Sequence, residues 1–192
     1  MSRVVAGVAG GTPLVSVPGS LTRPTTDRVK EALFSRLEAF NVVAGARVLD
    51  LYAGSGALGV ESASRGAETV DLVESDAKAS EVCQRNADML NGVVGRKVVT
   101  VHRSRVESFL DRTVQGTEWD LVFLDPPYPL DEPAMSSVLD GLSPHLAEGA
   151  VVVVERSSRS PEPGWPASLE RFAERKYGET TLWFAEPVAG GS

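Results

Sequence analysis

Cysteine and histidine are scarce in this chain, which has one cysteine, Cys83, and two histidines among its 192 residues. A single thiol excludes an internal disulfide and any cysteine-rich zinc site, and it is typical of a reducing compartment. His102 and His145 have neither an acidic partner nor ligand spacing along the sequence, so we assign neither a role and expect no metal centre. Cys83 falls in the middle of an expected helix and is interpreted as a small buried hydrophobic side chain.

Long apolar runs are also lacking, because no stretch approaches the roughly 18 apolar residues that a membrane span needs. Residues 1–11 contain one arginine and no apolar core of signal-peptide length. We therefore expect a cytoplasmic protein that has no membrane partner. The length suits one well-buried domain and leaves too little chain for two. We predict a monomer with an N-terminal arm over residues 1–20, a main domain over residues 21–186 and a flexible tail over residues 187–192.

Positive charge is the third scarcity, since the formal net charge is −7 at pH 7. Such a balance argues against broad, nonspecific binding of nucleic acid. The charge is unevenly placed. Residues 1–36 carry five basic and two acidic side chains, a net of +3, whereas residues 106–155 carry one basic and ten acidic ones, a net of −9. If the protein contacts a polyanion, it should do so with its N-terminal part.

From residue 47 onward, short apolar runs alternate with longer amphipathic stretches, which is the pattern of a parallel sheet covered by helices. The sequence therefore predicts an α/β fold. The expected strands are Arg47–Leu51, Thr69–Glu74, Val98–His102, Trp119–Leu124 and Ala150–Glu155. The expected helices between them are Gly56–Arg65, Asp76–Leu90, Val106–Arg112 and about Pro133–His145.

The two ends of the chain follow a different pattern. Leu169–Tyr177 and Thr180–Ala185 are separated by only two residues, which predicts an antiparallel hairpin at the end of the sheet. Near the N-terminus, Thr25-Thr26-Asp27 offers capping residues for a helix that runs to about Ala39. Residues 3–17 are rich in glycine and β-branched side chains, which indicates a small hairpin or extended arm.

A glycine-rich turn joins the first expected strand to the helix that follows it. Asp50 ends the strand, and Gly54 and Gly56 allow a ligand to approach the backbone closely. With Gly59 they match the G-x-G-x-x-G spacing of dinucleotide sites, yet an acid at the strand end is unsuited to a pyrophosphate. A cationic ligand such as S-adenosylmethionine, which has an ammonium and a sulfonium, fits better. A turn that binds nothing is the structural alternative.

The segment Asp125-Pro126-Pro127-Tyr128 follows the expected strand Trp119–Leu124. The two prolines must end the strand, because neither can donate to a ladder and each holds φ near about −65°. The carboxylate of Asp125 and the fixed carbonyl of Pro126 can accept both hydrogens of an aromatic amine, while Tyr128 stacks on the attached ring. The alternative is an ordinary turn after a buried strand.

Glu74 lies twenty residues after Gly54, at the end of the second expected strand. A carboxylate there can accept hydrogen bonds from both ribose hydroxyls. Ligands of open α/β sheets bind outside the carboxyl ends of the strands, where Asp50, Glu74 and Asp125 are all expected. A methyl donor and an amine hydrogen-bonded to Asp125 and Pro126 would therefore meet at one edge of the sheet.

The motif Asp50-x-x-x-Gly54-x-Gly56, followed by Glu74 and Asp125-Pro126-Pro127-Tyr128, resembles the S-adenosylmethionine-dependent amino-methyltransferases that act on nucleobases. The stretch Arg23-Pro24-Thr25-Thr26-Asp27-Arg28-Val29-Lys30-Glu31 is similar to the signature of the bacterial small-subunit ribosomal RNA (guanine-N2)-methyltransferases of the RsmD type. The resemblance covers roughly residues 3–186 and implies a class I, Rossmann-like methyltransferase fold. That fold is a doubly wound, seven-stranded, mostly parallel sheet with an antiparallel final hairpin.

The resemblance also implies the chemistry and the residues that perform it. S-adenosylmethionine would be the cofactor, and the acceptor would be the 2-amino group of one guanine in 16S ribosomal RNA, within the small ribosomal subunit or its assembly intermediate. The expected catalytic residues are Asp125, Pro126, Pro127 and Tyr128. The expected donor-binding residues are Asp50, Tyr52, Gly54, Ser55, Gly56, Glu74, Ser104, Arg105 and Asp125. RNA would meet the arm and the basic residues Arg3, Arg23, Arg28 and Lys30.

Two features depart from the family pattern. Residues 7–20 lack the basic side chains that members usually carry in the arm, and Arg103-Ser104-Arg105 replaces the usual acid or amide that reads adenine, so the main chain would hold adenine with help from Ser104. An ion pair is an equal alternative for Arg28, and a solvated surface position is the favoured alternative for Lys30. Other enzyme classes also stay open, namely an adenine amino-methyltransferase acting on DNA or RNA and a nucleotide-binding module.

Overall fold

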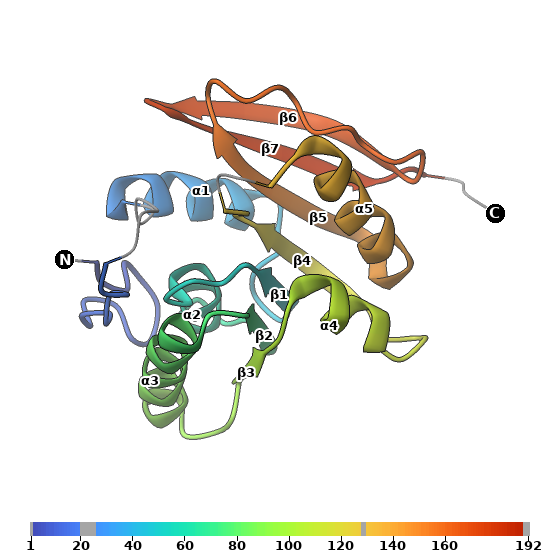
Figure 1. The fold of residues 1–192 in the computed structure, drawn as a ribbon. Helices are drawn as coiled ribbons and strands as arrows, with labels where there is room; N and C mark the ends of the chain where they lie inside the picture. The colour runs from blue at the N-terminus through green and yellow to red at the C-terminus, as the bar shows by residue number, and fades with distance from the viewer. Residues whose placement is uncertain (1, 20–25, 128–129, 190–192) are drawn as a thin grey trace.

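A seven-stranded sheet runs through the protein, whose computed structural model describes residues 2–19, 26–127 and 130–189. The strands are β1 (Arg47–Leu51), β2 (Thr69–Glu74), β3 (Val99–Arg103), β4 (Trp119–Leu124), β5 (Leu146–Ser157), β6 (Leu169–Tyr177) and β7 (Thr180–Pro187). Their order in the sheet is β3-β2-β1-β4-β5-β7-β6 (Figure 1). Strands β1 to β5 are parallel, and β7 pairs antiparallel with both β5 and β6. The predicted sheet and its antiparallel final hairpin are confirmed.

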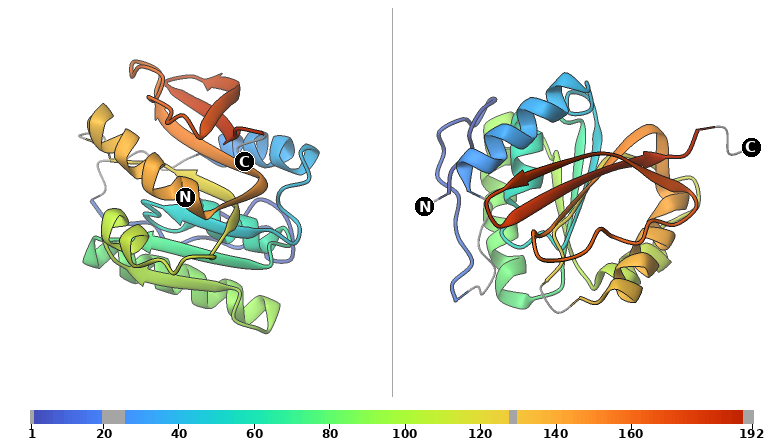
Figure 2. Two further views of the ribbon diagram at one scale, coloured as in Figure 1. Left: turned by 90° about the vertical axis from the view of Figure 1, so that its right-hand side faces the viewer. Right: turned by 90° about the horizontal axis from the view of Figure 1, so that it is seen from above.

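Helices cover both faces of the sheet, because successive residues of a strand point to opposite sides. Val48 and Phe123 face α1 (Asp27–Ala39), α2 (Ala57–Ser64) and α3 (Ala77–Val94) in one apolar core. Leu49 and Leu124 face α4 (Val106–Arg112) and α5 (Glu132–Leu142) in the other. Figure 2 shows the helices on either side of the sheet, so the doubly wound arrangement is also confirmed. In the described residues no helix is long and apolar enough to cross a membrane.

The boundaries of several elements differ from the prediction. Helix α3 continues past the expected end at Leu90 and stops at Gly95, which adopts the left-handed conformation with φ 84°. Helix α5 ends before a short 3₁₀ turn, Ser143–His145, instead of including it. Strand β5 begins four residues early, at Leu146, because the segment pairs with β4 across a register shift.

The N-terminal arm folds back on itself as a short hairpin-like loop. The Val4 amide donates to the Thr12 carbonyl at 2.9 Å, and the Leu14 amide donates to the Ser2 carbonyl at 2.9 Å. Val4, Ala9 and Leu14 are buried in the core formed with α1, α2 and α3. The arm is therefore packed onto the main domain, next to α2 and α3 (Figure 1).

Candidate active site

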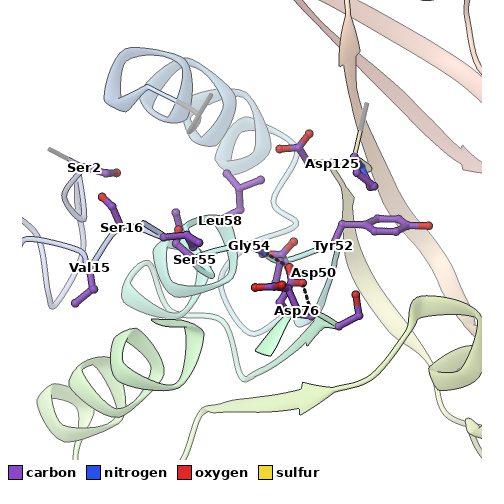
Figure 3. A pocket seen from close by; sticks show the side chains of 16 residues that line it. Ser2, Val15, Ser16, Asp50, Tyr52, Gly54, Ser55, Leu58, Asp76 and Asp125 are labelled. Carbon is purple, nitrogen blue, oxygen red and sulfur yellow. Dashed lines mark hydrogen bonds between the residues drawn. The ribbon is translucent and has the colours of Figure 1, made fainter. Parts of the chain in front are cut away.

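A pocket of about 370 Å³ lies at the carboxyl ends of β1, β2 and β4 (Figure 3). Its volume is within the range of about 300–1,000 Å³ that is usual for small-molecule sites. The strand ends are aligned there, since Leu51 pairs with both Val73 and Leu124. Three predicted acids, Asp50, Glu74 and Asp125, line this one pocket.

The glycine-rich turn forms one wall of the pocket. A Cβ atom built on Gly54, which has φ 59°, would meet no atom within 4 Å, so this side of the turn is open to a ligand. A Cβ on Gly56 would lie 2.9 Å from Leu72 Cδ1, and a Cβ on Gly59 would lie 2.3 Å from Leu72 Cδ2. The first glycine thus leaves space for a ligand, whereas the other two allow α2 to pack closely on the sheet. Tyr52 also has a positive φ, 62°, a strained conformation of the kind that clusters at functional sites.

Glu74 ties the glycine-rich turn to the start of α3. Its Oε1 accepts a hydrogen bond from the Gly54 amide at 2.8 Å, and its Oε2 accepts one from the Asp76 amide at 2.8 Å. Each carboxylate oxygen can still accept a second hydrogen bond. The side chain is half-buried and lines the pocket, as the predicted ribose contact requires.

Asp50 is buried beneath the turn, with 2% of its surface exposed. It accepts a hydrogen bond from the Gly59 amide at 3.2 Å, inside the first turn of α2. Burial raises the pKa of Asp50 well above its ordinary value, and the nearby charges of Glu74 and Glu155 raise it further. This carboxyl group therefore positions the helix and contributes to the acidic character of the pocket floor.

Asp125 lies at the end of β4, next to Glu155 of the neighbouring strand β5. Leu124 pairs with Val154 in the parallel register, so the two acids that follow are adjacent. Burial raises the pKa of Asp125 well above its ordinary value, and the charges of Glu155 and Asp50 add to this, against a smaller opposing effect of Arg156.

The rest of the Asp-Pro-Pro-Tyr segment is described in part. Pro126 is buried, and Pro127 is exposed and lines the pocket. The Pro127 carbonyl accepts a hydrogen bond from the Leu130 amide at 3.0 Å, which closes the turn after β4. Tyr128 lies outside the described residues, so its stacking role stays a prediction.

The predicted adenine-binding residues lie beside the pocket. The Ser104 amide donates to the Glu74 carbonyl at 3.1 Å, but neither Ser104 nor Arg105 belongs to the described residues that line the pocket. The Ser104 hydroxyl accepts a hydrogen bond from Arg112 at 3.0 Å. Arg105 is exposed, with its Nε 3.9 Å from a carboxylate oxygen of Glu107. The donor contacts expected of both residues remain predictions.

The expected surface position of Lys30 is wrong. Its side chain is fully buried, and its ammonium donates to the Arg3 carbonyl at 2.6 Å and lies 3.5 Å from Asp27 and 3.9 Å from Glu61. Burial lowers the pKa of Lys30, and the two carboxylates oppose this effect. The helix pattern gave no sign that the arm would fold over this face of α1, and the buried ammonium offers no exposed atom to RNA.

The other predicted RNA-binding residues remain untested. Arg28 is exposed, and Arg3 is exposed with its Nε 3.6 Å from Asp27 Oδ2. Arg23 lies outside the described residues.

Some side chains have hydrogen-bond partners that could not be predicted from the sequence. His102 does have an acidic partner, because its Nε2 lies 2.8 Å from Asp71 Oδ1, and Asp71 also accepts a hydrogen bond from the Trp119 indole at 3.1 Å. These contacts join β2, β3 and β4 and lie outside the pocket lining. Cys83 is buried as expected, with its Sγ 3.1 Å from the Gly54 carbonyl, and burial raises the pKa of its thiol.

Comparisons with known proteins agree with this geometry. The family model described as "Conserved hypothetical protein 95" matches residues 2–186. "Ribosomal RNA small subunit methyltransferase D" of Escherichia coli strain K12 is 35% identical over 193 residues, covering 98% of this chain and 91% of that protein. The protein of the same name from Haemophilus influenzae is 32% identical over 161 residues, covering 83% of this chain and 80% of that protein.

Solved structures show the same fold. The structure described as "Putative methyltransferase yhhF from Escherichia coli" superposes with a TM-score of 0.81 at 32% identity and covers 97% of this chain and 98% of that chain. A conserved hypothetical protein from Streptococcus pyogenes has a TM-score of 0.71 at 31% identity, with 82% and 94% of the two chains covered. The seven-stranded sheet is that of the class I methyltransferases.

Proposed function

This chain belongs to the family described as conserved hypothetical protein 95, the RsmD-type methyltransferases, and from that premise we propose that it methylates small-subunit ribosomal RNA. The methyl group of S-adenosylmethionine is transferred to the 2-amino group of a guanine in 16S RNA, within the small subunit or its assembly intermediate. The observation that carries this proposal is the juxtaposition, in one pocket, of a glycine-rich turn held by Glu74 and of Asp125 at the end of β4.

The chemistry of the pocket suits a cationic donor. Asp50, Glu74, Asp76 and Asp125 line it, and none of the described lining residues is a lysine or an arginine. A pyrophosphate would meet these carboxylates with no basic side chain to compensate, which argues against a dinucleotide. A ligand with an ammonium and a sulfonium meets opposite charge. The open side of Gly54 gives it room against the backbone. Glu74, which lines the same pocket, would accept hydrogen bonds from the ribose hydroxyls.

Asp125 and Pro126 act on the acceptor. The amine of guanine is a weak nucleophile, because its lone pair is delocalised into the ring. Hydrogen bonds from its two N–H groups to the Asp125 carboxyl and the Pro126 carbonyl favour a pyramidal nitrogen whose lone pair points at the methyl group. S-adenosylmethionine supplies a methyl group that its positively charged sulfur already activates. Holding the reactants in line can contribute up to about 7–11 kcal/mol.

The target guanine must leave its base stack before it reaches this pocket. Unstacking costs a few kcal/mol and costs least in a loop. Tyr128 is placed in sequence to stack on the extruded base, which would recover about 1–3 kcal/mol. A loop of the ribosomal RNA is therefore the favoured target.

Mass spectrometry of nucleosides from 16S RNA tests this function. A strain that lacks the protein should lose N2-methylguanosine at one position, and a plasmid copy of the wild-type gene should restore it. Loss of N6-methyladenosine instead would move the acceptor to adenine. An unchanged set of modified nucleosides would refute the proposal. A calorimetric titration of the purified protein with S-adenosylmethionine and with NAD separates a methyltransferase from a dinucleotide-binding module.

A further inference from the structure

The N-terminal arm forms part of the pocket wall. Ser2, Val15, Ser16 and Val17 of the arm are among the residues that line it. In Figure 3, Ser2, Val15 and Ser16 lie across the pocket from Asp125. A ligand in this pocket would therefore lie between the arm and the strand ends, and its affinity depends on where the arm sits.

The first half of the arm is held by α2. The Glu61 carboxylate accepts hydrogen bonds from the Val5 amide at 2.8 Å and the Ala6 amide at 3.1 Å. The Ser64 hydroxyl donates to the Ala6 carbonyl at 2.6 Å. Glu61 is fully buried and forms a 2.9 Å ion pair with Arg65. These contacts hold Val5 and Ala6, neither of which lines the pocket.

In the second half of the arm, a side chain of α3 holds Val15. Asn86 is 2% exposed, and its Oδ1 accepts a hydrogen bond from the Val15 amide at 2.9 Å. Its Nδ2 donates to the Val15 carbonyl at 3.0 Å and to the Ser55 carbonyl at 2.8 Å. Both amide hydrogens are thus used, one on the arm and one on the glycine-rich turn. Val15 and Ser55 line the pocket, whereas Asn86 does not.

We propose that Asn86 is a positioning residue for donor binding, because it bridges Val15 and Ser55 and so holds the arm against the glycine-rich turn. This inference rests on the proposed function for the identity of the donor, S-adenosylmethionine. It gives the arm a second purpose besides the RNA contact that the family resemblance implies. By linkage, a donor that binds against a seated arm also stabilises the seated arm.

Asn86→Asp tests the bridge with the smallest change in shape. An aspartate can still accept from the Val15 amide, but it loses both donated hydrogen bonds and sets a carboxylate against two carbonyls. The matched control is Asn91→Asp on the same helix. Asn91 bridges the Val98 and Val99 amides at 2.9 Å and donates to the Val99 carbonyl at 3.0 Å, and it does not line the pocket. Both variants lose hydrogen bonds from a side-chain amide to backbone carbonyls, but only Asn86→Asp loses them next to the pocket.

Calorimetric titration with S-adenosylmethionine is the primary measurement. We expect Asn86→Asp to raise the Kd about tenfold, which corresponds to about 1.4 kcal/mol, and Asn91→Asp to leave it within about twofold. Thermal midpoints should fall by similar amounts in both variants. With saturating donor, the single-turnover methylation rate of Asn86→Asp should stay within about twofold of wild type, so that the defect appears in KM and not in kcat.

A second variant keeps the test decisive if Asn86→Asp does not fold. Val15→Pro removes the Val15 amide hydrogen from the arm side and leaves Asn86 intact, so it should also raise the Kd. If folded Asn86→Asp, or failing that Val15→Pro, binds the donor as tightly as Asn91→Asp does, Asn86 is only a structural residue and the inference is overturned. If the wild-type protein itself fails to bind S-adenosylmethionine, the proposed function fails instead.

Discussion

Asp125→Asn should make the protein more stable and less active, and both effects follow from the surroundings of one carboxyl group. The side chain lies beside Glu155 and near Asp50, and its burial and these two charges raise its pKa. Asparagine has the same shape, has no charge to bury and can donate a hydrogen bond to Glu155. The substitution therefore removes an unfavourable ionisation, and it also removes the carboxylate that the proposed mechanism assigns to the guanine amine.

The pH dependence of the stability gain follows from the direction of the pKa shift. A carboxyl group whose pKa is raised in the fold binds more protons in the folded state than in the unfolded chain, so its contribution to stability is present at low pH and is lost as pH rises through the folded pKa. The advantage of asparagine should thus be absent below about pH 4, grow above it and then level off. Each unit of pKa shift corresponds to about 1.4 kcal/mol, and 1 kcal/mol moves the melting midpoint of a domain of this size by about 2–4 °C.

Asp120→Asn is the matched control, because Asp120 lies on β4, the strand that Asp125 follows, and its pKa is shifted in the opposite direction. Its carboxylate makes hydrogen bonds of 2.9 and 3.1 Å with the Arg47 guanidinium, and Arg47 lowers the pKa of Asp120. Its stabilising contribution is present above the unfolded pKa and is lost as pH falls. Since the pair is partly exposed, its removal should destabilise the protein by about 0.2–1 kcal/mol and leave methylation unchanged.

Urea unfolding between about pH 3.5 and pH 8 measures the change in stability, starting below the unfolded pKa of an aspartate. Single-turnover methylation of small subunits that lack the modification measures the change in activity. By analogy with oxyanion donors, the loss of one contact that strengthens in the transition state should lower the single-turnover rate at saturating donor by roughly 10²–10³. A destabilised Asp125→Asn variant would refute the electrostatic argument. A variant with a near-normal single-turnover rate would show that the Asp-Pro-Pro-Tyr segment is only a turn.

Three further substitutions separate the other parts of the site. Glu74→Gln should weaken S-adenosylmethionine binding by about 1.5–3 kcal/mol in calorimetry, because an amide cannot accept both backbone N–H groups that Glu74 now accepts; unchanged affinity would remove it from the donor site. Gly59→Ala should lower the free energy of unfolding by about 1–3 kcal/mol, because its Cβ would lie 2.3 Å from Leu72. Gly54→Ala should cost about 1–2 kcal/mol, because its φ of 59° is left-handed, and should also lose donor affinity; an unchanged donor Kd would contradict this. Tyr128→Ala should weaken binding of the flipped guanine by about 1–3 kcal/mol while Tyr128→Phe stays mild, and equal KM values for the two variants would exclude stacking.

Short sequence patterns were enough to predict most strands of the sheet and the three acids of the pocket. The bounds of β1, β2, β4 and β6 agree with the expected ranges. Strand β2 ends at an acid, β4 ends before Asp125 and two prolines, and β6 ends before Gly178. Asp50, Glu74 and Asp125 could be placed together because parallel strands bring their carboxyl ends to one edge. Each of these inferences needs only a short window of sequence and a general rule of sheet geometry.

Contacts between distant segments could not be predicted in this way. The arm is joined to Glu61 and Asn86 by hydrogen bonds that span 55 to 71 residues of sequence, and no periodicity encodes such a pairing. Lys30 illustrates the consequence, since a lysine between apolar helix positions is normally exposed, and here the arm covers it. The partner of His102 depends on the pairing of β2 with β3, which places Asp71 diagonally across the ladder.

The clustered carboxyl groups of the pocket lower the stability of the fold and at the same time favour the binding of a cation. Four carboxyl groups, from Asp50, Glu74, Asp76 and Asp125, line one small space, and burial and mutual repulsion raise the pKa values of Asp50 and Asp125. Such a cluster weakens the fold at neutral pH, because charge must be buried or protons retained. A cationic donor reverses that balance, since its ammonium and sulfonium stabilise the ionised carboxylates. The electrostatic strain of the protein without donor is then a source of affinity for a cation and of discrimination against the phosphates of a dinucleotide.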